Sequence, residues 1–166
     1  NLEKPLIAMI QGFCIGGGLA TALKADMRYA STDSQFGIPA VKLGLGYDAG
    51  SVKALADFVG PAYAGEILMT GRRFDAAEAL RMGLVNDVVE PDKLEQRVME
   101  TARMIAGNAP LTVRSMKVNV RATRQDPDQR DEARCQELVD ACFNSEDYIE
   151  GRRAFMEKRP PEWKGR

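Results

Sequence analysis

Three consecutive glycines near the start of the chain constrain its fold more than any other feature. Gly16, Gly17 and Gly18 lie between the apolar run PLIAMI and the segment LATALKAD, which is rich in good helix formers. The apolar run predicts a buried strand, and a helix that begins directly after the glycines completes a strand–turn–helix unit. Gln11 and four glycines interrupt the apolar stretch from residue 5 to residue 23, so this unit is favoured over a membrane span.

The glycines have two functional interpretations and one structural interpretation. A phosphate loop is excluded, because no Lys-Ser or Lys-Thr pair follows and the GxGxxG spacing is absent. An anion site built from backbone remains, since a helix start presents unpaired N–H groups and glycine lets a ligand approach them closely. Such a site suits an oxyanion that develops during a reaction. A tight turn with close strand–helix packing explains the same residues equally well.

The remaining pattern predicts an α/β fold whose C-terminal half is helical. Strands are expected over residues 27–32 and 84–90, and the Gly-rich stretch 34–50 is expected to be a loop with short extended pieces. Gly60 and Pro61 separate two expected helices, and Asp75 with Glu78 forms the start of a third. Four further helices are expected over residues 92–110, with Asp92 as cap, and over about 111–124, 128–143 and 146–157.

Composition excludes several classes of function. The net charge of -1 gives no basic field for nucleic acid, and the absence of histidine excludes Ser-His and Cys-His dyads. Zinc would lack its commonest nitrogen ligand, so no metal site is predicted. The cysteines Cys14, Cys135 and Cys142 form no CxxC motif. Unpaired thiols fit a reducing compartment, which predicts a cytoplasmic protein.

A series of short motifs runs through the whole chain in a fixed order. It comprises Lys4-Pro5, Gln11-Gly12, Gly16–Gly18, Asp26, Tyr29-Ala30, Phe36-Gly37, Pro39 and Gly44, then AAEALRMGLVNDVV and finally SEDYIEGRRAFMEKRPPEWKGR. In this order the motifs resemble those of the enoyl-CoA hydratase/isomerase family, the crotonase superfamily. The combined pattern is specific, although no single motif is.

The resemblance implies a fold, a substrate class and an assembly. Residues 1–108 are expected to form part of a crotonase-like spiral core of ββα units, and residues 109–166 a helical region for trimerisation and CoA contacts. The implied substrate is an acyl-CoA thioester, with no separate cofactor because coenzyme A is part of the substrate. A homotrimer or hexamer is implied, with no nucleic-acid or membrane partner. The chain begins with Asn rather than Met, and an N-terminal region carrying a second oxyanion N–H and the adenine pocket is expected to be missing.

The resemblance also makes ordinary hydration doubtful. Family hydratases carry two glutamates around one water, and the matching positions here are Ala20 and Ala40. Asp48 stands where other family members carry an acid, and one base is enough to move a double bond. Gly17 is expected to stabilise the thioester enolate, and burial near Ala40, Leu43 and Leu45 is expected to raise the pKa of Asp48. On the residues alone, Asp48 as a helix cap is the simpler interpretation.

The remaining candidate residues are expected to bind substrate rather than react. Gly16 and Gly18 flank the oxyanion donor, and Tyr47 either lines the acyl pocket or simply packs. Phe155 and Lys158 match a family segment that meets CoA phosphates, although a surface salt bridge explains Lys158 equally well. The alternatives to an isomerase are a non-catalytic acyl-CoA-binding protein, a thioester hydrolase and a slow hydratase.

Overall fold

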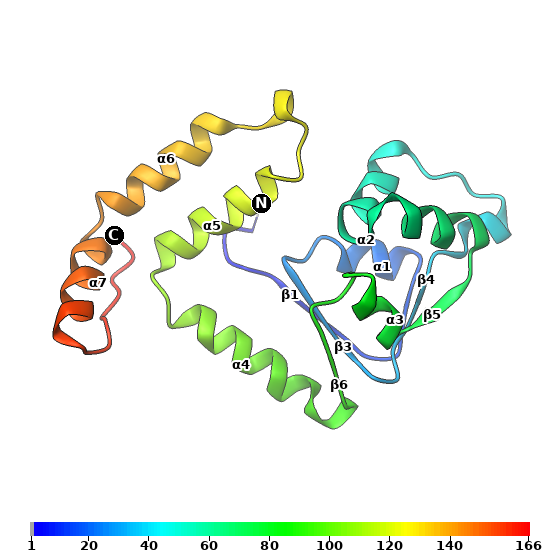
Figure 1. Cartoon of the computed structure of the whole chain (residues 1–166), viewed down its shortest axis with the longest axis horizontal. Coiled ribbons are helices and arrows are strands. Elements are labelled where there is room, and N and C mark those ends of the chain that lie inside the picture. Colours follow the sequence, from blue (N-terminus) through cyan, green and yellow to red (C-terminus); the bar gives the residue numbers. More distant parts are fainter. Residues whose placement is uncertain (1) are drawn as a thin grey trace. The chain divides into compact units, whose positions relative to one another are not determined.

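A computed structural model describes residues 2–166, which divide into two compact units. One unit is Leu6–Glu100, and the other joins Thr101–Arg166 to the N-terminal residues up to Pro5. Figure 1 shows that the strands lie in the first unit and that the second is helical. The α/β class predicted from the sequence is therefore confirmed, whereas the predicted functional division between residues 108 and 109 stays a prediction.

The first unit contains two small three-stranded sheets. The first sheet has the order β1 (Ile7–Ile10), β3 (Met27–Ser31) and β6 (Asp87–Val89), all parallel. The second has the order β2 (Phe13–Ile15), β4 (Gln35–Gly37) and β5 (Arg73–Asp75). In it, β4 pairs parallel to β2 and antiparallel to β5. The first four strands thus enter the two sheets in turn, whereas the consecutive strands β4 and β5 pair within one sheet.

Most helix signals of this unit are confirmed, although α1 begins within the glycines and ends at Ala22 rather than near Asp26. Helix α1 (Gly17–Ala22) follows β2, and α2 (Ala49–Thr70) is broken at Gly60, whose φ is 77°. Pro61 has no N–H to continue the helical ladder, so the two expected helices are confirmed as two parts of one kinked element. Asp75 accepts a hydrogen bond from the Glu78 backbone N–H at 2.8 Å and caps α3 (Ala76–Arg81), also as predicted.

Buried aromatic and aliphatic side chains form the core of this unit. Phe36 is fully buried and stacks on Phe74 with ring centres 5.7 Å apart, which joins β4 to β5. Arg28 is buried too: its Nε donates to the Leu84 carbonyl at 2.7 Å, and its guanidinium lies 3.9 Å from the centre of the Phe58 ring. These contacts hold β3 to the segment before β6 and to α2.

Four helices follow the sheets. They are α4 (Leu94–Ala106), α5 (Pro110–Ala122), α6 (Glu132–Phe143) and α7 (Glu146–Glu157), with short 3-10 turns η2 (Pro91–Lys93) and η3 (Pro127–Gln129). The prediction of Asp92 as the cap of α4 is wrong, because Asp92 lies inside η2. Proline at the first position of η2 favours that extra turn. Within residues 2–166 no helix is long and apolar enough to cross a membrane.

The last residues, Pro160–Arg166, lie against α7 and are called the C-terminal segment below. Asp147 is only 3% exposed and accepts hydrogen bonds from the backbone N–H groups of Lys164 at 2.6 Å and Gly165 at 2.9 Å. Glu150 accepts from the backbone N–H of Glu162 at 3.1 Å. The Trp163 indole N–H donates to the Gly107 carbonyl at 2.7 Å. Carboxylates of α7 thus hold the C-terminal segment by its backbone.

The C-terminal segment is expected to loosen in acid. The Arg159 guanidinium, followed by Arg153 and the Glu162 N–H, holds the pKa of Glu150 well below its usual value of 4.5. A carboxylate with a lowered folded-state pKa stabilises the fold above its ordinary pKa and loses that contribution as the pH falls further. Fluorescence of Trp163, the single tryptophan, should therefore change reversibly below about pH 4.5. In Glu150→Gln the altered fluorescence should already be present at neutral pH; an unchanged neutral spectrum in that variant would contradict the assignment.

Candidate functional site

The glycine turn lies at the carboxyl edge of a parallel strand pair. Strands β2 and β4 run side by side, with Ile15 opposite Gly37 at their ends. The Gly16 N–H donates to the Gly37 carbonyl at 2.8 Å, which ties the turn after β2 to the end of β4. Helix α1 follows β2, and the 3-10 helix η1 (Pro39–Leu43) follows β4. In open parallel sheets, ligands bind outside such carboxyl ends.

The backbone of the turn is open to solvent. Gly16 caps α1 with φ 55° and ψ -116°, a conformation that favours glycine, and Gly17 is the first helical residue. No side chain caps this helix start, and Gly17 and Gly18 are both exposed. A Cβ built on either residue would meet no atom within 4 Å, so close strand–helix packing does not explain them. The Gly17 N–H has no intrahelical acceptor and points from a helix start, as an oxyanion donor must.

The two positions that carry glutamates in family hydratases hold only methyl groups. Ala20 is exposed on α1, one turn beyond Gly17, whereas Ala40 is 7% exposed in η1 and packs into the hydrophobic core. Asp26 follows α1, but its carboxylate accepts the Leu6 backbone N–H at 2.7 Å and serves to fix the entry into β1. These two alanines therefore offer no proton donor or acceptor next to the glycine turn.

Asp48 differs from its predicted environment. It is exposed and caps α2, with Oδ1 accepting the Ser51 backbone N–H at 3.0 Å and Oδ2 accepting the Ser51 hydroxyl at 2.7 Å. Hydrogen bonds from the Ser51 side chain and then its backbone lower the pKa of Asp48. The prediction of a raised pKa is therefore wrong, because water and two donors stabilise the charged form. The alternative role as a helix cap is confirmed.

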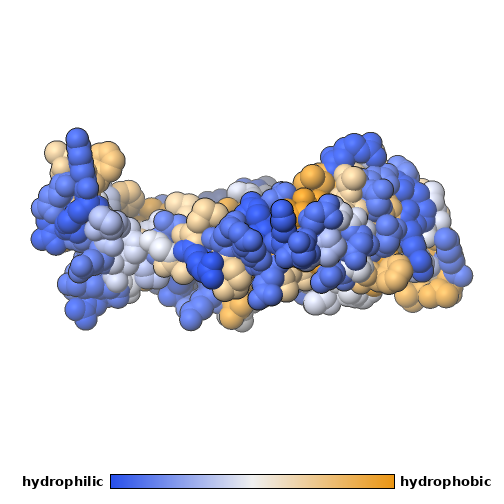
Figure 2. Space-filling view, turned by 90° about the horizontal axis from the view of Figure 1, so that it is seen from below, coloured by the Kyte–Doolittle hydropathy of each residue, from blue (hydrophilic) through white to orange (hydrophobic). Residues whose placement is uncertain are grey.

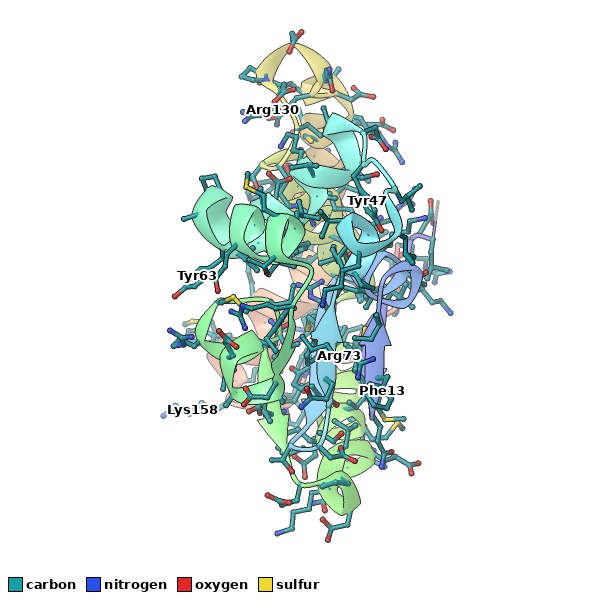
Figure 3. The ribbon with its side chains drawn as sticks, turned by 90° about the vertical axis from the view of Figure 1, so that its right-hand side faces the viewer. Phe13, Tyr47, Tyr63, Arg73, Arg130 and Lys158 are labelled. Atoms are coloured by element: carbon teal, nitrogen blue, oxygen red, sulfur yellow. The ribbon has the colours of Figure 1, made fainter. Side chains whose placement is uncertain are left out.

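The loop before Asp48 explains why the Asp48 carboxylate is not buried among apolar side chains. Leu43 and Leu45 are 78% and 60% exposed, so their side chains do not form the apolar surround that the sequence suggested. Gly44 between them adopts φ 68° and ends η1. Tyr47 is partly buried and packs against the core of this unit, and Figure 3 shows it on the loop that leads into α2.

Ser51 is the residue that the sequence analysis overlooked. It occupies the third position after Asp48, and a hydroxyl at this place in a first helical turn reaches the cap carboxylate. The pattern DAGS at residues 48–51 carried this signal. Ser51 lowers the pKa of Asp48, the only predicted proton carrier, and therefore belongs to the candidate site.

Phe155 and Lys158 lie in the second unit, near the end of α7. Phe155 is 82% exposed, and Lys158 adopts φ 53° and ends the helix. Among residues 2–166 Lys158 is the sole non-glycine residue with a positive φ. Arg159 beside it is bound to Glu150 at 2.6 Å and to Glu157 at 2.6 Å. Contacts of Phe155 and Lys158 with CoA stay a prediction.

Comparison with known proteins identifies the family. The sequence profile described as enoyl-CoA hydratase/isomerase matches residues 1–166. The chain belongs to this family. Among curated relatives, the carnitinyl-CoA dehydratase of Citrobacter koseri is 41% identical over 170 residues, and that of Escherichia coli O157:H7 is 40% identical. Each alignment covers 100% of this chain, which spans 65% of the length of either relative.

Solved structures of the family have the same fold. An enoyl-CoA hydratase/isomerase family protein from Hyphomonas neptunium is 40% identical, with a TM-score of 0.90 over 100% of this chain and 63% of the other. An enoyl-CoA hydratase from Bacillus anthracis is 33% identical, with a TM-score of 0.90 over 100% and 64%. An enoyl-CoA hydratase/carnithine racemase from Magnetospirillum magneticum is 37% identical, with a TM-score of 0.86 over 99% and 61%. The predicted family and crotonase-type α/β fold are thus confirmed.

Proposed function

We propose that this family member acts on acyl-CoA thioesters and moves a double bond along the acyl chain. The Gly17 N–H would bind the thioester oxygen, and Asp48 would carry the proton. The observation that supports this most is the exposed, uncapped start of α1 beside the end of β4. An N–H group held there is positioned before the reaction begins, which is the requirement for stabilising an enolate.

The residues favour isomerisation over hydration. Hydration needs one group that deprotonates water and another that delivers a proton, whereas Ala20 and Ala40 can do neither. In isomerisation the Asp48 carboxylate takes a proton from the α carbon of a 3-enoyl thioester, giving a dienolate and a neutral carboxylic acid. The acid then returns the proton to the γ carbon, and the double bond moves to the 2-position. Atoms and charge balance, and no water enters.

The charge state of Asp48 both helps and limits this reaction. Its pKa, lowered from a value that already lies far below neutral pH, leaves it ionised, so it is present as the base. The same shift weakens its affinity for a proton, because a base is most effective when its pKa lies near the working pH. Stabilisation of the enolate by the Gly17 N–H therefore has to provide a larger share of the rate enhancement.

Removal of the Ser51 hydroxyl is expected to strengthen the base. In Ser51→Ala the first cause of the lowered pKa disappears, so the pKa of Asp48 should move up toward its ordinary value. The acid limb of the pH–rate profile of isomerisation should move to higher pH, and the rate at neutral pH should rise. If the acid limb of Ser51→Ala lay at the same pH as that of the wild type, Asp48 would not be the group that carries the proton. Lys53→Ala, which removes an ion pair with Asp57 on the same helix, is the matched control.

A second candidate function is acyl-CoA binding without catalysis. The supporting observation is that both carboxylate oxygens of Asp48 are engaged with Ser51 and exposed to water. A carboxylate held in that way serves α2 as a cap. The glycine turn would then bind the thioester carbonyl and nothing more.

One assay separates these functions. The protein is mixed with 3-enoyl-CoA substrates of increasing chain length, and conversion to 2-enoyl-CoA is followed together with the dissociation constant. Conversion supports the isomerase; binding without conversion supports the second candidate, and release of free CoA indicates hydrolysis. Carnitinyl-CoA is the informative comparison, since curated relatives are named as its dehydratases. Because dehydration needs the same acid–base pair as hydration, we expect it to be slow here.

A further inference from the structure

Arg28 of β3 is a charged side chain in the interior of the first unit. Figure 2 shows mainly hydrophilic residues on the face that it views, and a surface is the usual place for charges. Arg28 is instead only 3% exposed. Burial of a charged group costs free energy that burial of an apolar side chain does not, unless other contacts replace the lost water. The contacts of the guanidinium therefore indicate what Arg28 does in the fold.

The guanidinium of Arg28 contacts three different parts of the chain. Its Nη1 donates to the Ala25 carbonyl at 2.9 Å, and its Nε donates to the Leu84 carbonyl at 2.7 Å. It also lies 3.9 Å from the centre of the Phe58 ring, close enough for a cation–π contact. Ala25 follows α1, Leu84 precedes β6, and Phe58 belongs to α2. One side chain thus joins the end of α1 to α2.

The contact with Ala25 fixes the far end of α1. The Ala25 N–H donates to the carbonyl of Ala22, the last residue of α1, at 3.1 Å. Helix α1 has only six residues, so the place of its end determines the place of its start at Gly17. The proposed oxyanion donor is therefore held in part through Arg28.

Phe58 is the point at which the first part of α2 is held. Its ring lies on Arg28 and packs against the core of the unit. A Cβ built on Gly83 would lie 3.3 Å from the Phe58 carbonyl oxygen, so α2 comes very close to the turn after α3. The helix is interrupted two residues later at Gly60. Because this first part of α2 begins at its cap Asp48, the contacts of Phe58 determine where Asp48 lies.

We propose that Arg28 is a positioning residue, which holds the start of α2, with Asp48, in a fixed place relative to the start of α1, with Gly17. The effect of Arg28 on the reaction rests on the proposed function, whereas its effect on the placement of the two helices does not. A planar guanidinium donates to two carbonyls and stacks on a ring at the same time, which a lysine ammonium does not do. A misplacement of reacting groups by about 1 Å can cost about 10²-fold in rate.

Substitutions on both sides of the Arg28–Phe58 contact test this proposal. Arg28→Lys keeps the charge and removes the planar guanidinium. We expect kcat for isomerisation of a 3-enoyl-CoA to fall about 10–10²-fold, while the dissociation constant of the thioester stays close to the wild-type value. Phe58→Leu should cause a similar loss, and Phe58→Tyr, which keeps the ring, should retain the wild-type rate. The double variant of Arg28→Lys and Phe58→Leu should lose no more than the worse single variant, because both remove the same contact.

Arg97→Lys is the matched control. The Arg97 guanidinium of α4 lies 5.1 Å from the centre of the Tyr29 ring, and its Nε donates to Asp87 at 2.7 Å. These contacts join α4 to β3 and β6, so this variant should keep kcat near the wild-type value. Residual dipolar couplings of the backbone N–H groups measure the orientation of α1 relative to α2 without any substrate. We expect that orientation to change in Arg28→Lys and to stay unchanged in Arg97→Lys.

The outcomes separate this proposal from the proposed function. An unchanged orientation of α1 and α2 in both Arg28→Lys and Phe58→Leu would overturn the positioning role, and so would a wild-type kcat in both variants. Equal losses in Arg28→Lys and Arg97→Lys would show a general loss of stability instead. A wild type that neither isomerises 3-enoyl-CoA nor exchanges its α protons would contradict the proposed function. The dipolar couplings would then still decide whether Arg28 places the two helices.

Discussion

Replacement of Gly17 by proline is expected to lower the rate of isomerisation by about 10²–10³-fold, the effect of removing one oxyanion donor. Proline has no N–H, so the thioester oxygen loses its partner at the start of α1. The fold should survive, because Gly17 is the first helical residue, where proline is well tolerated. Gly16 before it has ψ -116°, far from the helical value that a following proline disfavours.

Gly17→Ala is the control for that substitution. Alanine keeps the N–H, and a Cβ at Gly17 meets no atom within 4 Å, so the variant should retain most of the activity. Steady-state kinetics on the three proteins should show the loss mainly in kcat with proline, and near wild-type values with alanine. An equal loss in both variants would show that the open space at Gly17, rather than its N–H, matters.

Replacement of Asp48 by asparagine is expected to abolish proton transfer while preserving the fold. General acid–base catalysis by a positioned side chain typically contributes about 10²–10⁴-fold, and a single proton carrier has no substitute among Ala20 and Ala40. Asparagine caps helices about as well as aspartate, so the cap of α2 should be kept through the amide oxygen. Acyl-CoA affinity and the thermal unfolding midpoint should therefore stay close to those of the wild type.

The matched control is Asp75→Asn. Asp75 caps α3 in the same manner, through the Glu78 N–H at 2.8 Å, but has no place in the proposed reaction. Its variant should retain full isomerase activity. If Asp48→Asn kept the wild-type rate, Asp48 would be a cap only, and the non-catalytic function would follow.

Several helix breaks, caps and starts could be predicted from the sequence, because each depends on the conformational preferences and hydrogen bonds of residues close together in the chain. Gly60 followed by Pro61 breaks α2, since a positive φ and a missing N–H both interrupt a helical ladder. Asp75 caps α3 because a carboxylate three residues before a backbone N–H can reach it. The start of α1 at Gly17 follows from the glycine turn itself. These features depend on neighbours only a few residues away.

The features that the sequence did not predict depend on distant partners. Strands β2 and β5 have three residues each, too few for a periodic pattern, and they form because both pair with β4, which lies in the stretch where short extended pieces were expected. Figure 3 shows Arg73 of β5 and Phe13 of β2 beside each other across β4, with the Arg73 guanidinium 5.2 Å from the centre of the Phe13 ring.

The environment of Asp48 was misjudged for a similar reason. Apolar neighbours in sequence suggested burial, but Leu43 and Leu45 are exposed, and the partner that fixes the carboxylate is Ser51. Sequence proximity to leucines does not decide solvent access, whereas the cap geometry of the first helical turn does. The order of the motifs identified the family, but it did not predict the direction in which the pKa of Asp48 is shifted.

The most direct measurement is deuterium incorporation into 3-enoyl-CoA in deuterated water, followed by NMR at the α and γ carbons. Exchange reports formation of the enolate itself, whether or not the double bond moves. We predict exchange by the wild type, loss of exchange in Asp48→Asn, and retention in Asp75→Asn. Absence of exchange by a wild-type protein that still binds the thioester would contradict the proposed chemistry and leave Asp48 as the cap of α2.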